Sequence, residues 1–219
     1  AAAGVQVVGG VLVEQGRTLL AGWLARVSRP HVTLKLASTF DGRVAAADGT
    51  SRWITSDLAR RHAHDVRAQM DAVVVGTGTA LTDDPSLTAR DSDGRLTSHQ
   101  PMRVVVGMRD LPAGAALHGP GGPLVQLRTH DPYVVLGELA ARGAHRVLVE
   151  GGPSLSAAFL RAGLVDELHT YLAPVLLGAG PSAVADLGIT TIDDAVRLVP
   201  TQVLRLGPDV LVVATRSED

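Results

Sequence analysis

The sequence predicts an α/β fold with three αβα layers and a mixed central sheet. Three patterns carry this prediction: short apolar runs that end in glycine, helical patterns between them, and two β-rich segments that flank residues 207–209. Short runs that are apolar throughout are typical of parallel strands buried on both faces, whereas two strands joined by a tight turn pair antiparallel. Alternating strands and helices followed by a hairpin therefore favour one mixed sheet with helices on its faces.

Composition narrows the class of protein. The 219 residues include 20 Lys and Arg against 22 Asp and Glu, so we expect no binding of nucleic acid or of an anionic membrane. There is no apolar run of about 18 residues and no basic-then-apolar start, so we expect neither a membrane span nor a secretory signal. The absence of cysteine excludes disulfides, thiolate nucleophiles and cysteine-ligated zinc. We therefore expect a cytoplasmic globular protein without a metal site.

The chain opens with a strand-like run at 5–8 and a helical pattern at 12–27, which stops at Pro30. These two elements have no sheet of their own, so we interpret them as the end of a preceding unit. Residues 31–37 alternate between apolar and polar side chains. They predict a strand with one apolar face and one face, that of Lys35, free for chemistry.

The later elements follow from periodicity and turn residues. Two Asp-Gly pairs predict turns on either side of a short ribbon at 43–46, and Thr55 or Ser56 suits the N-cap of the next helix. Residues 82–90 have the composition of a loop. The sequence predicts helices at 57–70, 132–142 and from 153 onward, strands at 72–75, 103–106, 124–127, 147–149 and 167–173, and a closing hairpin of 196–206 with 210–214.

Residues 146–163 have the pattern of a strand, a glycine turn and a helix. Gly151-Gly152 supply the turn, and Pro153 stands at the first helical position, where a missing N–H is tolerated. A helix that begins after such a turn directs free backbone N–H groups and the positive end of its dipole at one point. This arrangement predicts a binding point for an anionic ligand. The alternative is an ordinary strand–helix turn that binds nothing.

Glycine also follows three other predicted strands, at 42, 76–78 and 178–180. Because the carboxyl ends of parallel strands meet at one edge of a sheet, these glycines indicate a crevice there. Arg67 and Arg90 suit a phosphate because a guanidinium offers a fork of N–H donors; the alternative is two solvated surface arginines. The polar candidates for this crevice are Lys35, Ser51, Trp53, Thr55, Arg67, Thr79, Asp83, Arg90 and Glu150.

The acidic candidates leave alternatives open. Asp83-Asp84 form either an acid–base pair or a plain turn with an Asx cap. Glu150, at the end of a buried strand, needs a partner and either contacts a ligand or caps the structure. The eight histidines have no metal-ligand spacing, and the sequence has neither a Gly-x-Ser-x-Gly motif nor a P-loop. A crevice for phosphorylated ligands without a nucleophile predicts a bound redox cofactor, which carries the chemistry itself.

A series of motifs runs in order over nearly the whole chain. They are Val32-Thr-Leu-Lys-Leu-Ala37, Asp41-Gly42, Ser51-Arg-Trp-Ile-Thr-Ser56, Arg67-Ala-Gln69, Thr79, Asp83-Asp-Pro85-x-Leu-Thr-x-Arg90 and Val149-Glu-Gly-Gly-Pro-Ser154. Together they resemble the reductase domain of bifunctional riboflavin biosynthesis proteins of the RibD/RibG type. The resemblance implies a dihydrofolate-reductase-like fold and NADPH-dependent reduction of 5-amino-6-(5-phosphoribosylamino)uracil to 5-amino-6-(5-phosphoribitylamino)uracil.

The same resemblance implies roles for particular residues. Lys35 matches the strand lysine that faces the ribose, and we expect it to assist catalysis. The substrate-binding positions are Ser51, Arg67, Leu87, Arg90 and Glu150. The cofactor positions are Ala37, Trp53, Thr55, Thr79, Asp83, Gly152, Pro153 and Ser154.

The chain departs from this family in two places. The cysteines and the His-x-Glu of the family's zinc deaminase half are missing, and residues 1–28 resemble only the last strand and helix of that half. We therefore expect the reductase domain to span 29–219. Gly107 stands where the family usually has an aspartate, so the match to the family is weaker at the adenosine end of the cofactor site.

Two other functions remain open at this point. The first is a reductase of a pterin- or folate-like substrate, for which a phosphate site is unnecessary. The second is a non-catalytic dimerisation module of a deaminase. The closing hairpin leaves an apolar edge that favours a homodimer.

Overall fold

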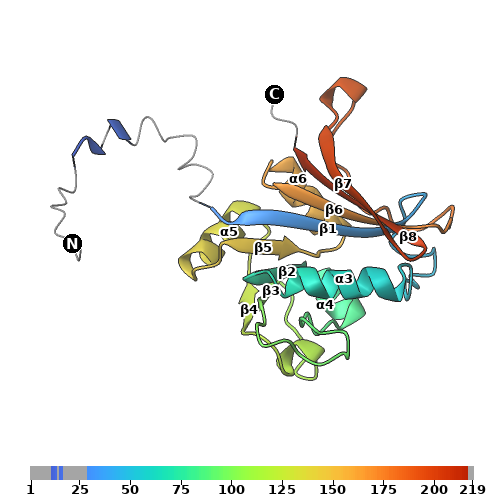
Figure 1. Ribbon diagram of the computed structural model, residues 1–219, viewed down its shortest axis with the longest axis horizontal. Coiled ribbons are helices and arrows are strands. Elements are labelled where there is room, and N and C mark those ends of the chain that lie inside the picture. Colours follow the sequence, from blue (N-terminus) through green and yellow to red (C-terminus); the bar gives the residue numbers. More distant parts are fainter. Residues whose placement is uncertain (1–10, 14, 17–28, 217–219) are drawn as a thin grey trace.

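The computed structural model describes residues 11–13, 15, 16 and 29–216 (Figure 1). Its strands are β1 (His31–Thr39), β2 (Ala72–Gly76), β3 (Met102–Val106), β4 (Leu124–Leu127), β5 (Arg146–Val149), β6 (Glu167–Ala173), β7 (Leu198–Leu206) and β8 (Asp209–Arg216). Its helices are α3 (Asp57–Arg67), α4 (Thr77–Asp83), α5 (Pro132–Ala141) and α6 (Pro153–Arg161), with short 3₁₀ turns at Ala116–His118 and Ile192–Asp194.

The strands form one eight-stranded sheet in the order β4-β3-β2-β5-β1-β6-β8-β7. The first six strands of this order pair parallel, whereas β8 runs antiparallel to β6 and β7 runs antiparallel to β8. The three-layer α/β fold with a mixed sheet is therefore confirmed. The closing hairpin is also confirmed, with β7 at the free edge of the sheet (Figure 1).

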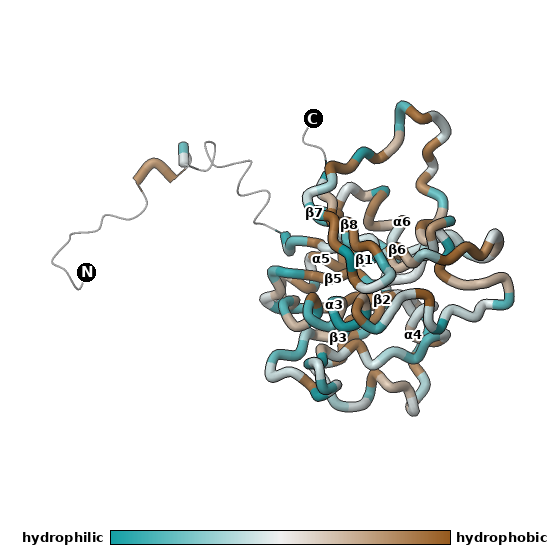
Figure 2. Tube along the Cα trace, turned by 45° about the vertical axis from the view of Figure 1, so that its right-hand side comes forward, coloured by the Kyte–Doolittle hydropathy of each residue, from teal (hydrophilic) through white to brown (hydrophobic). Residues whose placement is uncertain are grey.

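Two apolar layers hold the helices against the sheet. On one face, α5 and α6 pack on side chains of β1, β2, β3 and β5, among them Leu34 and Val149. On the opposite face, α3 and α4 pack on the alternate side chains of β2, β3 and β5, among them Val75 and Leu148. Figure 2 shows the apolar segments gathered at the strands, with polar stretches outside them. Because side chains alternate along a strand, Lys35 points to the α3 face, opposite Leu34.

The start of α3 is fixed by the closing hairpin. Ser56, one of the two predicted caps, accepts a hydrogen bond from the Ala59 N–H at its Oγ. The buried carboxylate of Asp209, the first residue of β8, accepts a hydrogen bond of 2.7 Å from the Ser56 N–H. This contact links the first turn of α3 to a strand far away in the sequence, and thereby sets where the cavity-facing side chains of α3 lie.

The structure differs from two local predictions. Helix α4 occupies part of the segment expected to be a strand end and a loop. Two glycines and three threonines in or next to it are poor helix formers, so its stability comes from packing, with Ala80 and Thr77 buried. The ribbon predicted at 43–46 is wrong: Arg43 forms an isolated bridge with Ser182 instead, because the loop after β6 lies alongside it.

Two further points concern the limits of the fold. The predicted remnant of a preceding domain, residues 1–28, lies outside the described residues except for 11–13, 15 and 16. Among the helices that the structure describes, none combines the length and the apolar character needed to cross a membrane.

Candidate active site

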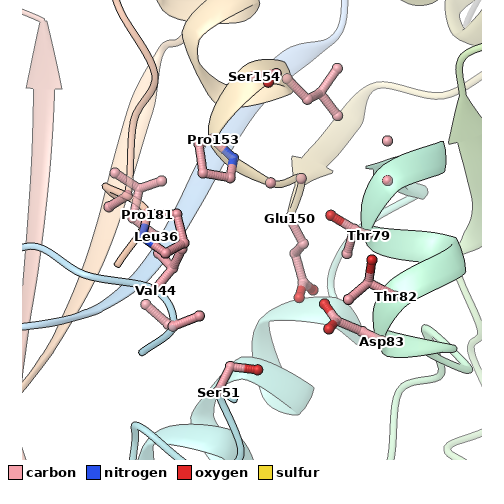
Figure 3. A pocket seen from close by; sticks show the side chains of 18 of the residues that line it. Leu36, Val44, Ser51, Thr79, Thr82, Asp83, Glu150, Pro153, Ser154 and Pro181 are labelled. Carbon is pink, nitrogen blue, oxygen red and sulfur yellow. The ribbon is translucent and has the colours of Figure 1, made fainter. Parts of the chain in front are cut away.

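Two cavities open at the carboxyl ends of β1, β2 and β5. The first has a volume of about 540 Å³ and extends over the start of α6 (Figure 3). The second has a volume of about 490 Å³ and extends along α3 toward the loop 84–90. The two cavities share a boundary lined by Lys35, Ala37, Val44, Ser51, Thr79, Asp83 and Glu150. In Figure 3 the Glu150 side chain hangs from the end of β5 into the middle of this space, opposite Thr82 and Asp83 of α4.

The first cavity contains the glycine turn. An added Cβ at Gly151 lies 2.5 Å from Leu155 Cδ2, so any side chain at this position collides with α6. Gly152 is the N-cap of α6 and has no side-chain cap, and an added Cβ there lies 3.1 Å from Thr79 Oγ1. The N–H groups of Ser154 and Leu155 have no acceptor among the described residues. The turn thus leaves donors and open space at a helix N-terminus, as an anionic group requires.

Helix α4 begins beside this turn. Its N-cap, Gly76, also lacks a side-chain cap, and β2, which precedes it, is the sheet neighbour of β5. Gly76, Gly78 and Thr79 line the first cavity. The first turn of α4 therefore forms part of the wall of the cavity into which the start of α6 opens.

Glu150 is the centre of a buried ion cluster. Its side chain is 5% exposed, and its two oxygens accept hydrogen bonds from Arg67 Nε at 2.5 Å and from Arg67 Nη2 at 2.8 Å. Lys35 Nζ lies 3.8 Å from Glu150 Oε2. Burial by itself raises the pKa of Glu150, but the charges of Arg67 and Lys35 outweigh it and hold this pKa at about 2. Glu150 is therefore a fixed anion between two cations.

Lys35 is unusual in both its surroundings and its chemistry. It is the single lysine of the sequence; every other basic residue counted with it is arginine. Its ammonium lies over the ring of the buried Tyr171, 5.7 Å from the centroid. Burial lowers the pKa of Lys35, and the neighbouring charge of Glu150 offsets this only in part. An arginine cannot release its proton in this way, so this position combines a cation with a proton that can be exchanged.

The second cavity has a basic wall. Arg60, His64 and Arg67 occupy positions i, i+4 and i+7 of α3 and line the cavity together. Arg90 lines the same cavity from the loop 84–90, and its Nη1 donates to the Gly94 carbonyl at 2.7 Å. Arg67 also donates from Nη1 to the Thr88 carbonyl at 3.1 Å. With Glu150, these contacts use three of its five N–H donors.

The loop 84–90 has a constrained backbone. Leu87 has a φ of 51° and a side chain that is 2% exposed, so its backbone takes the left-handed conformation while its side chain packs in the core. Asp84 has a φ of 42°. Such conformations persist in non-glycine residues only where the surroundings impose them. The loop is therefore held in one shape at the wall of the second cavity.

All fourteen residues predicted for the site line one of the two cavities or both. Gly152, Pro153 and Ser154 line the first cavity only. Trp53 and Thr55, expected at the cofactor, line the second cavity beside the arginines, and the guanidinium of Arg60 lies 4.3 Å from the Trp53 ring centroid. The structure thus brings the candidates together, and their individual roles stay predictions.

Sequence reasoning missed Arg60 and His64. Both could have been found from the sequence, because they precede Arg67 by seven and three residues and so lie on the same face of the predicted helix. The structure also gives a reason for Gly107, where φ is 133° and an added Cβ lies 2.6 Å from Thr77 Oγ1. An aspartate at this position meets both strain and a collision with the start of α4.

Comparisons with known proteins agree with this geometry. Residues 30–212 match the family model described as the RibD C-terminal domain. Riboflavin biosynthesis protein RibD of Mycobacterium tuberculosis is 49% identical over 213 residues, which is 96% of this chain and 62% of that protein. The chain therefore spans less than two thirds of the length of this curated relative.

Two solved structures share the fold. Acinetobacter baumannii RibD (form 2) superposes with a TM-score of 0.78 at 31% identity, covering 99% of this chain and 66% of that one. A Thermotoga maritima protein described as a diaminohydroxyphosphoribosylaminopyrimidine deaminase/5-amino-6-(5-phosphoribosylamino)uracil reductase superposes with a TM-score of 0.76 at 28% identity, covering 98% and 65%. The predicted dihydrofolate-reductase-like fold agrees with these neighbours. The family model matches residues 30–212, which is most of this chain, so the chain belongs to the RibD C-terminal domain family.

Proposed function

We propose that this chain is an NADPH-dependent reductase of riboflavin biosynthesis. Its reaction reduces the ribosyl group of 5-amino-6-(5-phosphoribosylamino)uracil to the ribityl group of 5-amino-6-(5-phosphoribitylamino)uracil. The observation that carries the proposal is the ion cluster in which Lys35 and Glu150 lie at the boundary of two cavities and Arg67 lines the second. One cavity suits a dinucleotide and the other a phosphorylated substrate, so the reacting atoms of both would meet at this boundary.

The first cavity fits the cofactor. A side chain at Gly151 would collide with α6, Gly152 leaves little room beside Thr79, and the uncapped start of α6 faces the cavity. We assign the cofactor phosphates to the backbone N–H groups at the start of α6, with Thr79 and Asp83 lining the approach. When bound, the nicotinamide supplies the hydride. The preference for NADPH over NADH is part of this proposal.

The second cavity fits the substrate phosphate. Arg67 and Arg90 line this cavity together with Ser51 and Leu87, and Arg67 has two N–H donors that its contacts with Glu150 and Thr88 do not use. A phosphate bound there orients the ribosyl group toward Lys35 and Glu150. Phosphate-free substrates such as dihydropterins would leave this basic wall without a partner, so the phosphorylated substrate is the better match.

We assign Lys35 the catalytic role. Its Nζ holds a proton beside the fixed anion of Glu150, at the boundary that the two ligands would share. An ammonium in a partly buried cavity stabilises negative charge that develops on the substrate more strongly than one in water. Arg67 keeps Glu150 ionised, and Glu150 in turn orients the ammonium.

We also propose the domain limits and the assembly. Residues 29–219 form the reductase domain, and 1–28 belong to a preceding deaminase domain. Two copies pair through β7, the edge strand, on which Val199, Val203 and Leu204 are 50%, 65% and 41% exposed. An exposed apolar edge strand of this length offers unpaired backbone groups and apolar side chains to another chain. Sedimentation equilibrium tests the pairing: Val203→Lys gives monomer where the unaltered chain gives dimer.

The reaction is tested by mixing the chain with NADPH and the deaminated substrate, and following the absorbance of the reduced nicotinamide. We expect consumption by the unaltered chain, a raised KM in Arg90→Ala and a lowered kcat in Lys35→Gln. Arg95→Ala is the matched control, because its side chain is 79% exposed and lies outside both cavities. NADPH binding without consumption, together with consumption of a dihydropterin, would favour the pterin reductase. Absence of NADPH binding would favour the non-catalytic module.

A further inference from the structure

His64 lies within the basic wall of the second cavity, yet no role follows from the motifs. It is the one histidine among the described residues that line either cavity. Its Nδ1 is 3.0 Å from the Thr88 carbonyl oxygen. Because a carbonyl oxygen only accepts, Nδ1 must carry the proton of this hydrogen bond. Nε2 then is the nitrogen that gains or loses a proton, and it has no partner among the described residues.

The surroundings of His64 oppose a positive charge while the cavity contains no anion. Burial lowers the pKa of His64, and the guanidinium charges of Arg67 and, less strongly, Arg90 lower it further. The hydrogen bond to the Thr88 carbonyl and the charge of Glu150 act in the opposite sense but do not outweigh them. Asp65, the next residue on α3, is exposed and lies outside the cavity. The other charged residues that line the cavity are Lys35, Arg52, Arg60, Asp83 and Asp84.

A dianion bound in the second cavity would favour the positive charge on His64 that the cavity without an anion disfavours. Two negative charges placed against Arg67 and Arg90 also approach His64, which lines the same cavity. An opposite charge within about 4–6 Å raises the pKa of a histidine, so a bound dianion favours the imidazolium form of His64. The imidazolium then gains a second donor, Nε2–H, for the anion.

We propose that His64 is a third, proton-linked cation of a phosphate subsite: neutral in the absence of an anion, and an imidazolium when a phosphomonoester dianion binds. This inference rests on the proposed function, because it takes the ligand of the second cavity to be a phosphorylated substrate. It adds a consequence, namely that binding of the substrate phosphate takes up a proton. Affinity for the dianion therefore falls as the pH rises through the pKa of His64 in the complex.

Isothermal titration calorimetry tests this directly. Sulfate is the first probe, because it stays a dianion between about pH 5 and 8, the range in which histidine titrates, so any proton uptake belongs to the protein. D-Ribose 5-phosphate is the second probe. Titrations in two buffers of different ionisation enthalpy give the protons taken up per anion bound. We expect uptake by the unaltered chain near neutral pH, and an affinity for sulfate that falls about tenfold toward alkaline pH.

The key variant is His64→Asn, whose amide can still donate to the Thr88 carbonyl but cannot be protonated. We expect it to bind sulfate without proton uptake and with little pH dependence, at an unchanged melting temperature. His130→Asn is the matched control, since His130 is exposed and lies outside both cavities. Equal proton uptake in His64→Asn, or no anion binding by the unaltered chain, would overturn the proposal. Proton-linked anion binding without reductase activity would instead remove the proposed function and leave the role of His64 intact.

Discussion

The guanidinium of Arg67 and the carboxylate of Glu150 form a two-point ion pair between the last residue of α3 and the residue after β5, 83 positions apart in the sequence. The pair crosses from the helical layer to the edge of the sheet and is only slightly exposed. A buried charge that loses its partner is strongly unfavourable. This contact therefore helps to hold the end of α3 and to keep Glu150 ionised beside Lys35.

The first prediction concerns this contact. Arg67→Ala leaves Glu150 with only Lys35 as a nearby cation, so we expect a loss of about 3 kcal/mol in the free energy of unfolding, measured by urea denaturation. Adding Glu150→Gln to Arg67→Ala removes the unpaired charge and recovers part of this loss. Arg95→Ala, at an exposed ion pair, should change the free energy by less than about 0.5 kcal/mol. Additive losses in the double variant would show that the two side chains act independently.

The second prediction is a dependence of stability on acid. The pKa of Glu150 is about 2 in the folded chain, against an ordinary value of 4.5. A lowered pKa stabilises the fold fully above the ordinary value and progressively less as the pH falls toward 2; the contribution is on the order of 3 kcal/mol. Unfolding free energies measured over this range should therefore decline with falling pH more steeply for the unaltered chain than for Glu150→Gln. Glu138→Gln, at a surface pair, should follow the unaltered chain.

Much of the fold follows from the sequence because local patterns and packing agree. The strand Glu167–Ala173 begins and ends where its pattern predicts, and the strand Leu124–Leu127 does as well. Helix α4 could not be predicted, since its residues disfavour a helix and its stability depends on packing against the sheet, including strands β3 and β5 that lie further along the chain. The ribbon at 43–46 fails for a similar reason: its partner, Ser182, is supplied by a loop far along the chain.

The site shows the same division. The sequence predicted that the candidate residues meet at one edge of the sheet, and there they line two adjacent cavities. The sequence could not show that the Glu150 carboxylate forms a two-point ion pair with the Arg67 guanidinium, because this pair depends on how α3 lies across the sheet. Nor could it divide the residues between the cavities. Trp53, for which the resemblance implies a cofactor contact, lines the second cavity together with the arginines, and its role stays a prediction.

The third prediction concerns Gly107, the departure from the family. Gly107→Asp meets an unfavourable φ and a collision with Thr77 Oγ1, so we expect a loss on the order of 2 kcal/mol. Because Thr77 begins α4, NADPH binding should weaken as well. Thr77→Ala in the same chain should relieve the collision but not the backbone strain, and so restore only part of the stability. Gly137→Ala is the control: it lies in α5 with open space around its Cβ, and should gain about 0.5–1 kcal/mol. An aspartate variant as stable as the unaltered chain would contradict the prediction.

The last prediction uses the single lysine of the sequence. NMR of the chain with isotope-labelled lysine should show one side-chain signal, which makes the titration of Lys35 directly measurable. Because burial lowers the pKa of Lys35 and Glu150 offsets this only in part, the signal should titrate below the ordinary lysine value, and in Glu150→Gln at a still lower pH.

If the ammonium is the catalytic form, kcat at saturating substrate falls as the pH rises, since the proton is then lost; saturation separates this decline from the change in substrate affinity expected of His64. Lys35→Gln should lower kcat by about 100-fold or more. Lys35→Arg keeps the charge and should abolish the alkaline decline, because a guanidinium does not deprotonate in this range. A decline that persists in Lys35→Arg would assign the titrating group to another residue and remove Lys35 from the chemistry.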